Sequence, residues 1–114
     1  MQDHIYKIVG ADEWWMARKA GIYHGAAIDR TDGFIHFSTA EQVEETAAKH
    51  FAGQGGLLLV TVDPALLGPA LKYEPSRGGA LFPHLYASLS LSAVIREAPL
   101  PLNDDGRHDF SGLI

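Results

Sequence analysis

The fold of this chain is decided by the stretch Asp32-Gly33-Phe34-Ile35-His36-Phe37-Ser38-Thr39. Gly33 after Asp32 is typical of a turn, and the aromatic and β-branched residues that follow favour a half-buried strand. On a strand, Ile35 and Phe37 point to one face while His36 points to the other. The sequence therefore predicts a short strand with one core face and one polar face.

A helix is predicted directly after this strand. Ser38 followed by Glu41 fits a capping box, in which a hydroxyl and a carboxylate bond the free amides of a helix start. His36 and Ser38 are then expected beside a helix N-terminus, where free N–H groups favour anionic or carbonyl ligands. We therefore expect a binding site at this junction. The helix has an apolar stripe at helical spacing, formed by Ala40, Val43, Ala47 and Phe51.

Composition narrows the classes of function. The 114 residues suffice for one domain, which we expect to span residues 1–114. A formal net charge of −5 argues against a general nucleic-acid partner, because no basic stripe is present to neutralise phosphates. Without cysteine, the chain has no disulfide and no thiolate nucleophile. The N-terminus is unlike a signal peptide and the apolar runs are too short for a membrane span, so we expect a cytoplasmic protein.

Turn residues divide the remaining chain into short elements. One helix is expected over 13–20, with Asp12 as its N-cap and Gly21 at its end. Residues 26–32 are predicted to form a loop, and the leucine-rich run 57–62 is predicted to be the central strand. Because the elements lack regular βαβ spacing, the fold class is α+β. Further strands are predicted at 5–9, 71–75, 82–86 and 89–95.

Four polar side chains stand in mostly apolar surroundings and are candidates for chemistry: His36, Glu74, His84 and Tyr86. His36 has a structural alternative, a half-buried imidazole bonded to the backbone. Glu74 could equally be a solvated carboxylate at a strand end, and Tyr86 a packing residue. His84 follows a glycine-rich loop and Pro83, so it is expected near the surface. Rossmann, P-loop, zinc and nucleophile-elbow signatures are absent from the sequence.

Four blocks of sequence carry a family resemblance: Ile5-Tyr6-Lys7-Ile8, the stretch 32–38, the helix around Thr46-Ala47, and Phe82-Pro83-His84-Leu85-Tyr86. They resemble a small bacterial family catalogued as domain of unknown function 952. The resemblance extends from about residue 5 to residue 101, and the two histidine-bearing blocks are its most specific parts. Ala87 departs from the glycine expected there, which affects local backbone geometry. The family name itself implies no activity.

A more distant likeness implies a fold and a ligand. A strand with glycine, aromatic, histidine and serine residues that enters an amphipathic helix is similar to the nicotinamide pocket of ADP-ribosyltransferases. The likeness implies an ADP-ribosylation-like fold, with two small, mostly antiparallel sheets around a cleft that holds NAD, and two short helices. RNA 2′-phosphotransferases share this fold and also use histidine-rich sites. The likeness therefore implies a small-molecule nucleotide partner and an ADP-ribosyl or RNA phosphate transferase, with NAD as substrate and no metal.

The chemistry of such a transferase can be assigned to residues. Breaking the bond between nicotinamide and ribose creates an oxocarbenium-like centre, which needs an aromatic face, polar groups for the ribose and a carboxylate for the developing charge. Glu74 is expected to stabilise that charge, and His84 to bind a phosphate or act as a general acid. The candidate catalytic residues are Glu74, His84 and His36, and the candidate nucleotide-binding residues are His36, Ser38, Tyr86, Tyr6 and Arg77, the last as a diphosphate clamp.

Two other functions remain open at this point. The first is a metal-dependent hydrolase with His36, His84 and Glu74 as ligands, although the local His-to-His spacing of such sites is missing. The second is a module without enzymatic activity that keeps the cleft for a nucleotide or as an interaction surface. The acceptor of any transfer and the oligomeric state do not follow from the sequence.

Overall fold

Four strands form the largest sheet of the computed structural model, which describes residues 3–114 with the exception of the Arg77 side chain. Their order is β4 (Ser38–Thr39), β1 (Ile5–Gly10), β5 (Leu57–Val62) and β9 (Val94–Leu100), and neighbouring strands are antiparallel. The leucine-rich run is β5, an interior strand whose residues are all buried. Burial on both faces explains why this run is apolar throughout.

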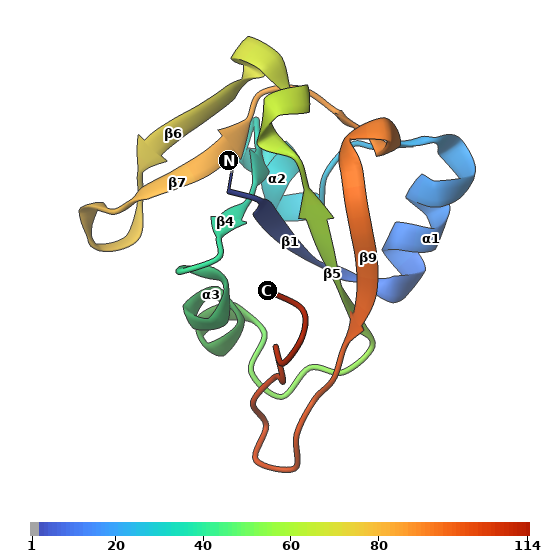
Figure 1. Cartoon of the computed structure of the whole chain (residues 1–114), viewed down its shortest axis with the longest axis vertical. Coiled ribbons are helices and arrows are strands. Elements are labelled where there is room, and N and C mark those ends of the chain that lie inside the picture. Colours follow the sequence, from blue (N-terminus) through green and yellow to red (C-terminus); the bar gives the residue numbers. More distant parts are fainter. Residues whose placement is uncertain (1–2) are drawn as a thin grey trace.

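Two smaller antiparallel sheets complete the α+β fold of the described residues. One has the order β3 (Ile35–His36), β7 (Leu81–Leu85) and β6 (Leu71–Pro75), and the other pairs β2 (Ile22–Tyr23) with β8 (Leu89–Ser90). Figure 1 shows β6 and β7 as a hairpin on one side of the large sheet, with α1 (Ala11–Ala20) on the opposite side. The α+β class with small antiparallel sheets is confirmed, although three sheets are present where two were expected.

The α-helices in the described part of the chain are α1, α2 (Ala27–Asp32) and α3 (Val43–His50). The loop predicted for residues 26–32 is wrong, because these residues form α2. The side chain of Asp29 accepts a 2.7 Å hydrogen bond from the backbone N–H of Ala26 at the start of this helix, and Gly33, with φ of 88°, ends it. None of these helices has the length and apolar character needed to span a membrane.

The strand predicted from the stretch 32–39 is shared between two sheets. Its first half, β3, pairs with β7 and places His36 opposite His84, whereas its second half, β4, pairs with β1 and places Ser38 opposite Tyr6. Between them, the backbone N–H of Phe37 donates a 3.0 Å hydrogen bond to the carbonyl of Pro83. The predicted alternation is confirmed, since Ile35 and Phe37 are buried in one core cluster, whereas His36 between them lies outside it and is half-buried.

The capping box predicted for Ser38 and Glu41 is wrong. Pairing of β4 with β1 keeps Ser38 extended, and α3 begins only at Val43. Ser38 is instead buried, with its hydroxyl 2.9 Å from that of Thr46. The predicted apolar stripe of α3 is correct, because Val43 and Ala47 are buried in the core.

Buried residues cover both faces of the large sheet. On β1, Ile5 and Val9 belong to one apolar cluster, whereas Tyr6 and Ile8 belong to a second cluster with Val43 and Ala47 of α3. This alternation follows from the two-residue period of a strand. It also places the Lys7 side chain among the apolar residues of the first face, where it is 7% exposed.

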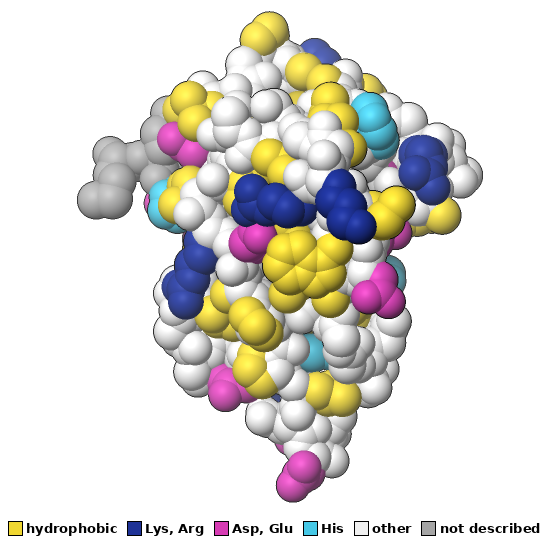
Figure 2. All heavy atoms as spheres, turned by 90° about the vertical axis from the view of Figure 1, so that its right-hand side faces the viewer, with side chains coloured by type: hydrophobic (Ala, Val, Ile, Leu, Met, Phe, Trp, Pro, Cys, Tyr) yellow, Lys and Arg dark blue, Asp and Glu magenta, His cyan; other side chains and the backbone are white. Residues whose placement is uncertain are grey.

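The two adjacent tryptophans of α1 differ in their surroundings. Trp14 is fully buried and its indole N–H donates a 2.8 Å hydrogen bond to Glu97 of β9, which Arg18 also contacts. Trp14 thus packs in the core, as the large apolar area of an indole ring favours. Trp15 is half exposed, and Figure 2 shows hydrophobic side chains beside Lys and Arg side chains on this face of the molecule. Helix α1 begins after Gly10, so Asp12 lies in its first turn and is not its N-cap.

The C-terminal third departs from the predicted strand at 89–95. That segment contains β8, a 3₁₀ turn at Leu91–Ala93, and the start of β9. Strand β9 includes Pro99, which an edge strand tolerates because its outer N–H groups need no partner. Residues 101–114 form mainly turns, and Phe110 among them is buried in the second cluster.

Candidate functional site

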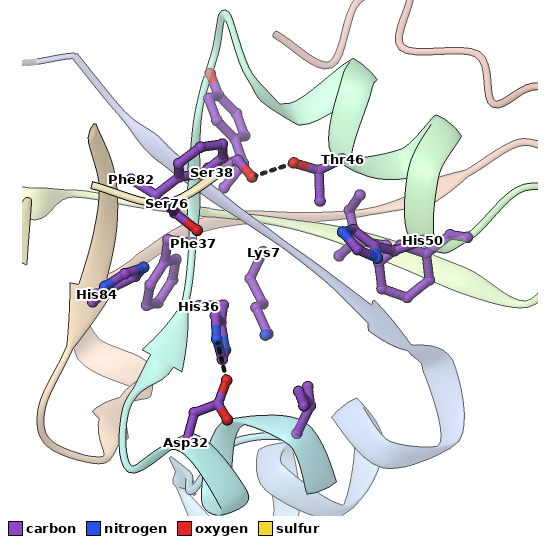
Figure 3. A pocket seen from close by; sticks show the side chains of 14 residues that line it. Lys7, Asp32, His36, Phe37, Ser38, Thr46, His50, Ser76, Phe82 and His84 are labelled. Atoms are coloured by element: carbon purple, nitrogen blue, oxygen red, sulfur yellow. Dashed lines mark hydrogen bonds and ion pairs between the residues drawn. The ribbon is translucent and has the colours of Figure 1, made fainter. Parts of the chain in front are cut away.

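A cavity of about 550 Å³ opens where the large sheet, the β3–β7–β6 sheet, α2 and α3 meet (Figure 3). Its volume is within the range of small-molecule sites in proteins. Aromatic side chains form much of its wall, among them Phe37, Phe51 and Phe82. Its polar lining includes Lys7, Asp32, His36, Ser38 and His84.

The two histidine-bearing segments meet at this cavity. His36 and His84 are direct partners in the pairing of β3 with β7, and their ring centroids are 5.7 Å apart at an interplanar angle of 70°. Both side chains line the cavity. The structure thus brings together two residues that lie far apart along the chain.

The imidazole of His36 is held between two carboxylates of α2. Its Nδ1 lies 2.6 Å from Oδ1 of Asp29, and its Nε2 lies 3.0 Å from Oδ2 of Asp32 (Figure 3). Both ring nitrogens thus lie within hydrogen-bond distance of a carboxylate oxygen. The hydrogen-bond partners of the His36 ring are therefore side-chain carboxylates. The structural alternative, an imidazole bonded to the backbone, is wrong. Neither nitrogen is left with a free lone pair for a metal.

Asp29 is the buried centre of this network. Its carboxylate accepts hydrogen bonds from the ammonium of Lys7 at 3.1 Å and from the backbone N–H of His36 at 3.1 Å, besides those from Ala26 and the His36 ring. Burial acts to raise the pKa of Asp29, but the His36 hydrogen bond together with the charge and hydrogen bond of Lys7 lower it to about 2. Burial lowers the pKa of Lys7, which the Asp29 charge opposes.

The backbone beside Asp29 is shaped for close approach. Gly25 has φ of 102°, and a Cβ at this position would lie 2.8 Å from the Cβ of Asp29. Glycine is required at this position for two reasons. It adopts the positive φ without strain, and it has no Cβ to collide with the Asp29 side chain.

His84 is buried, so the expectation of a surface position is wrong. Its side chain packs against the Phe34 ring, with centroids 4.1 Å apart and an interplanar angle of 29°, and its Nδ1 lies 2.8 Å from Oε1 of Glu74. The strand β7 is interior to its sheet, and this explains the burial. The ring nevertheless lines the cavity.

Glu74 contacts His84 and Tyr86 contacts Glu74, and neither Glu74 nor Tyr86 lines the cavity. The same Oε1 of Glu74 accepts from His84 and, at 2.7 Å, from the hydroxyl of Tyr86. Hydrogen bonds from Tyr86 and His84 lower the pKa of the Glu74 carboxyl. Among the described residues that line the cavity, Asp32 supplies the carboxylate and Glu74 does not.

The remaining predicted binding residues fall into two groups. Tyr6 and Ser38 line the cavity, as their positions on paired strands β1 and β4 require. The predicted role of Arg77 rests on a side chain that lies outside the described part of the structure.

Three charged residues of the site, Lys7, Asp29 and Asp32, were not predicted. Lys7 carried a signal, because it shares a strand face with the apolar residues Ile5 and Val9 and so had to be buried. Asp29 and Asp32 lie in the segment predicted as a loop, where nothing in the sequence indicates that Asp29 is buried or that Asp32 faces the cavity. Within residues 3–114, no group of three or more His, Asp or Glu side chains is arranged to hold a metal ion.

The chain is similar in sequence and structure to proteins of one family. The sequence model of the family described as "Protein of unknown function (DUF952)" matches residues 8–97. The X-ray crystal structure of protein CC0527 from Caulobacter crescentus is 51% identical, with a TM-score of 0.91 and 95% of each chain covered. The solution NMR structure of CC0527 is 50% identical, with a TM-score of 0.87, and the match covers 97% of this chain and 96% of that one. No curated protein matches.

Proposed function

This chain belongs to the DUF952 family, and we propose that its cavity binds a nucleotide of the NAD or ADP-ribose type. The observation that carries the proposal is the pair His36 and His84, which meet in the wall of a cavity of about 550 Å³. Aromatic walls beside a few fixed polar groups suit a ligand that combines a flat base with a hydroxylated sugar.

Each part of the ligand has matching groups in the lining. The rings of Phe37, Phe51 and Phe82 offer surfaces for a base or for nicotinamide. Lys7 offers hydrogen bonds to sugar, amide or phosphate oxygens, and the hydroxyl of Ser38 can accept one from a sugar hydroxyl or an amide N–H. These matches support binding and leave the reaction open.

Transfer of the ADP-ribosyl group is the second candidate function, and the placement of Asp32 and His84 favours it. Asp32 would stabilise positive charge on the ribose as the bond to nicotinamide breaks and nicotinamide leaves with the electron pair. His84 would take the proton of the attacking hydroxyl. Phosphate transfer from RNA would use the same histidine. The charge-stabilising role first assigned to Glu74 thus moves to Asp32, because Asp32 lines the cavity.

Calorimetry and thermal unfolding with NAD, ADP-ribose and AMP test the proposal. A ligand at 100 times its Kd should raise the free energy of unfolding by about 2.7 kcal/mol. His84→Ala should weaken binding by at least about tenfold, as expected when a buried hydrogen-bonding group is removed. The matched control His24→Ala, an exposed histidine outside the cavity lining, should bind like the parent protein.

Release of nicotinamide from NAD, followed by proton NMR, separates the two functions. The transferase would be supported if the parent protein releases nicotinamide and Asp32→Asn abolishes this release but still binds NAD. Binding without release would leave a ligand-binding module. If none of the three ligands binds or stabilises the protein, the proposed function is wrong.

A further inference from the structure

The geometry points to Glu74, whose carboxylate also accepts a hydrogen bond from Tyr86, as a positioning residue that holds His84 in the tautomer protonated at Nδ1. The Nε2 lone pair of His84 then faces the cavity as an acceptor for a ligand O–H or N–H group. This inference rests on the proposed function in one respect, the identity of the ligand that would bind to Nε2. It replaces the direct role in charge stabilisation that the sequence suggested for Glu74.

The chemistry of the two hydrogen bonds shows which atom carries each proton. An ionised carboxylate only accepts, so the 2.8 Å contact between His84 Nδ1 and Glu74 Oε1 places a proton on Nδ1. The Tyr86 hydroxyl donates to the same oxygen at 2.7 Å. Two donors on one oxygen keep the carboxyl ionised, in agreement with its lowered pKa. In a neutral imidazole, the proton on Nδ1 leaves Nε2 as the acceptor.

Ring packing fixes the orientation of the imidazole. Phe34 stacks on His84 and also contacts the rings of His36 and Tyr86, with centroid distances of 4.1, 4.6 and 5.1 Å, respectively. The side chain of His84 is 7% exposed, so rotation of the ring would displace close neighbours. The hydrogen bond and the stacking therefore define one orientation.

The second ring nitrogen of His84 is open to the cavity. No hydrogen bond to Nε2 is formed within the described residues, yet among these residues no buried side-chain polar atom lacks a partner. It follows that Nε2 is reachable by solvent, and the ring lines the cavity. A ribose hydroxyl is the donor that the proposed ligand would bring to this atom.

Nitrogen NMR of protein labelled with ¹⁵N-histidine tests the tautomer directly. Spectra are recorded at a pH of about 8.5, above the range in which histidine ordinarily titrates, and His84 is assigned by its absence in His84→Gln. The parent protein should show His84 protonated at Nδ1. Glu74→Leu should shift most of the population to the Nε2-protonated form, because the acceptor is lost.

Three further variants separate positioning from structure. Glu74→Gln keeps an acceptor oxygen and should retain the Nδ1-protonated form, whereas Tyr86→Phe should keep the tautomer and leave the fold intact. Glu41→Leu, an exposed carboxylate away from the cavity, is the matched control and should change nothing. An Nε2-protonated parent, or a Glu74→Leu spectrum identical to that of the parent, would overturn the inference.

Binding assays on the same variants distinguish this inference from the proposed function. Glu74→Leu should weaken nucleotide binding about tenfold, and Glu74→Gln should restore most of the affinity. If the tautomer behaves as stated but no nucleotide binds, the proposed function fails and the positioning role stands. If a nucleotide binds but the tautomer does not depend on Glu74, the positioning role fails.

Discussion

Asp29 shows how one residue can join the fold to the site. It starts α2 through Ala26, neutralises the buried ammonium of Lys7 and orients the ring of His36. Replacing any of these donors would leave a buried charge incompletely paired, which is costly because water cannot reach it. The geometry of the cavity wall therefore depends on a side chain that is itself behind that wall.

The low pKa of Asp29 predicts an acid-dependent loss of stability. The pKa of Asp29 in the folded protein is about 2, below its ordinary value of 3.8. The ionised carboxylate therefore stabilises the fold at every pH above about 3.8. That contribution, about 2 kcal/mol, should disappear as the pH falls from about 4 to about 2. Urea unfolding at several pH values measures it.

Asp29→Asn is the variant to compare. The difference in unfolding free energy between the parent protein and Asp29→Asn should shrink as the pH falls, whereas Asp104→Asn, at an exposed position, should track the parent throughout. A difference that stays constant with pH would show that the Asp29 charge is not the source of the stability.

Among the elements, the segment formed by β3 and β4 has the most consequence for the site. It supplies His36 to one sheet and Ser38 to another, with Phe37 between them in the core. The two sheets are therefore fixed relative to each other by backbone pairing on both sides of one buried ring.

Truncation of that ring should be strongly destabilising. Phe37→Ala should lower the free energy of unfolding by about 3–5 kcal/mol, because it removes a fully buried aromatic side chain and leaves a void. Phe34→Ala, at a half-buried position on the other face, should cost less. Denaturant unfolding measures both, and equal losses would contradict the deeper burial of Phe37.

Elements whose pattern is local were predictable from the sequence. β1, β5 and the stripe of α3 follow from alternation or helical spacing, and His36 and Ser38 were placed beside one another by the same alternation. The division of one strand between two sheets was not predictable, because pairing partners lie far along the chain. Helix α2 was missed because it has an inward aspartate in place of an apolar stripe.

For the site as a whole, sequence reasoning named residues that meet in the structure but did not predict the contacts between them. It identified His36, His84 and Glu74, but not that Glu74 contacts the outer side of His84. That relation depends on the register of β6 against β7, which turn length and core packing set together. Hydrogen-bond direction and burial emerge only once the sheets are assembled.

At the scale of the whole molecule, the C-terminal segment closes the second apolar cluster. Phe110 is buried there, and the carbonyl of Gly112 accepts a 2.9 Å hydrogen bond from Arg96 of β9. A segment rich in turns is thus part of the core and covers one face of the large sheet.

Loss of this anchor should destabilise the entire fold. Phe110→Ala should lower the free energy of unfolding by about 3–5 kcal/mol, while Ile114→Ala, at an exposed position, should change it by less than about 0.5 kcal/mol. Chemical denaturation monitored by tryptophan fluorescence measures both. A Phe110→Ala protein as stable as the parent would mean that the segment does not contribute to the core.

The strand shared by two sheets also determines how far the shape of the cavity can change. Separation of the two sheets would break backbone pairing on one side of Phe37 or on the other. The cavity is therefore preformed and rigid, and it does not open and close between the sheets. A long molecule would therefore place only the part that matches this shape inside the cavity, and the rest of it would remain in solvent.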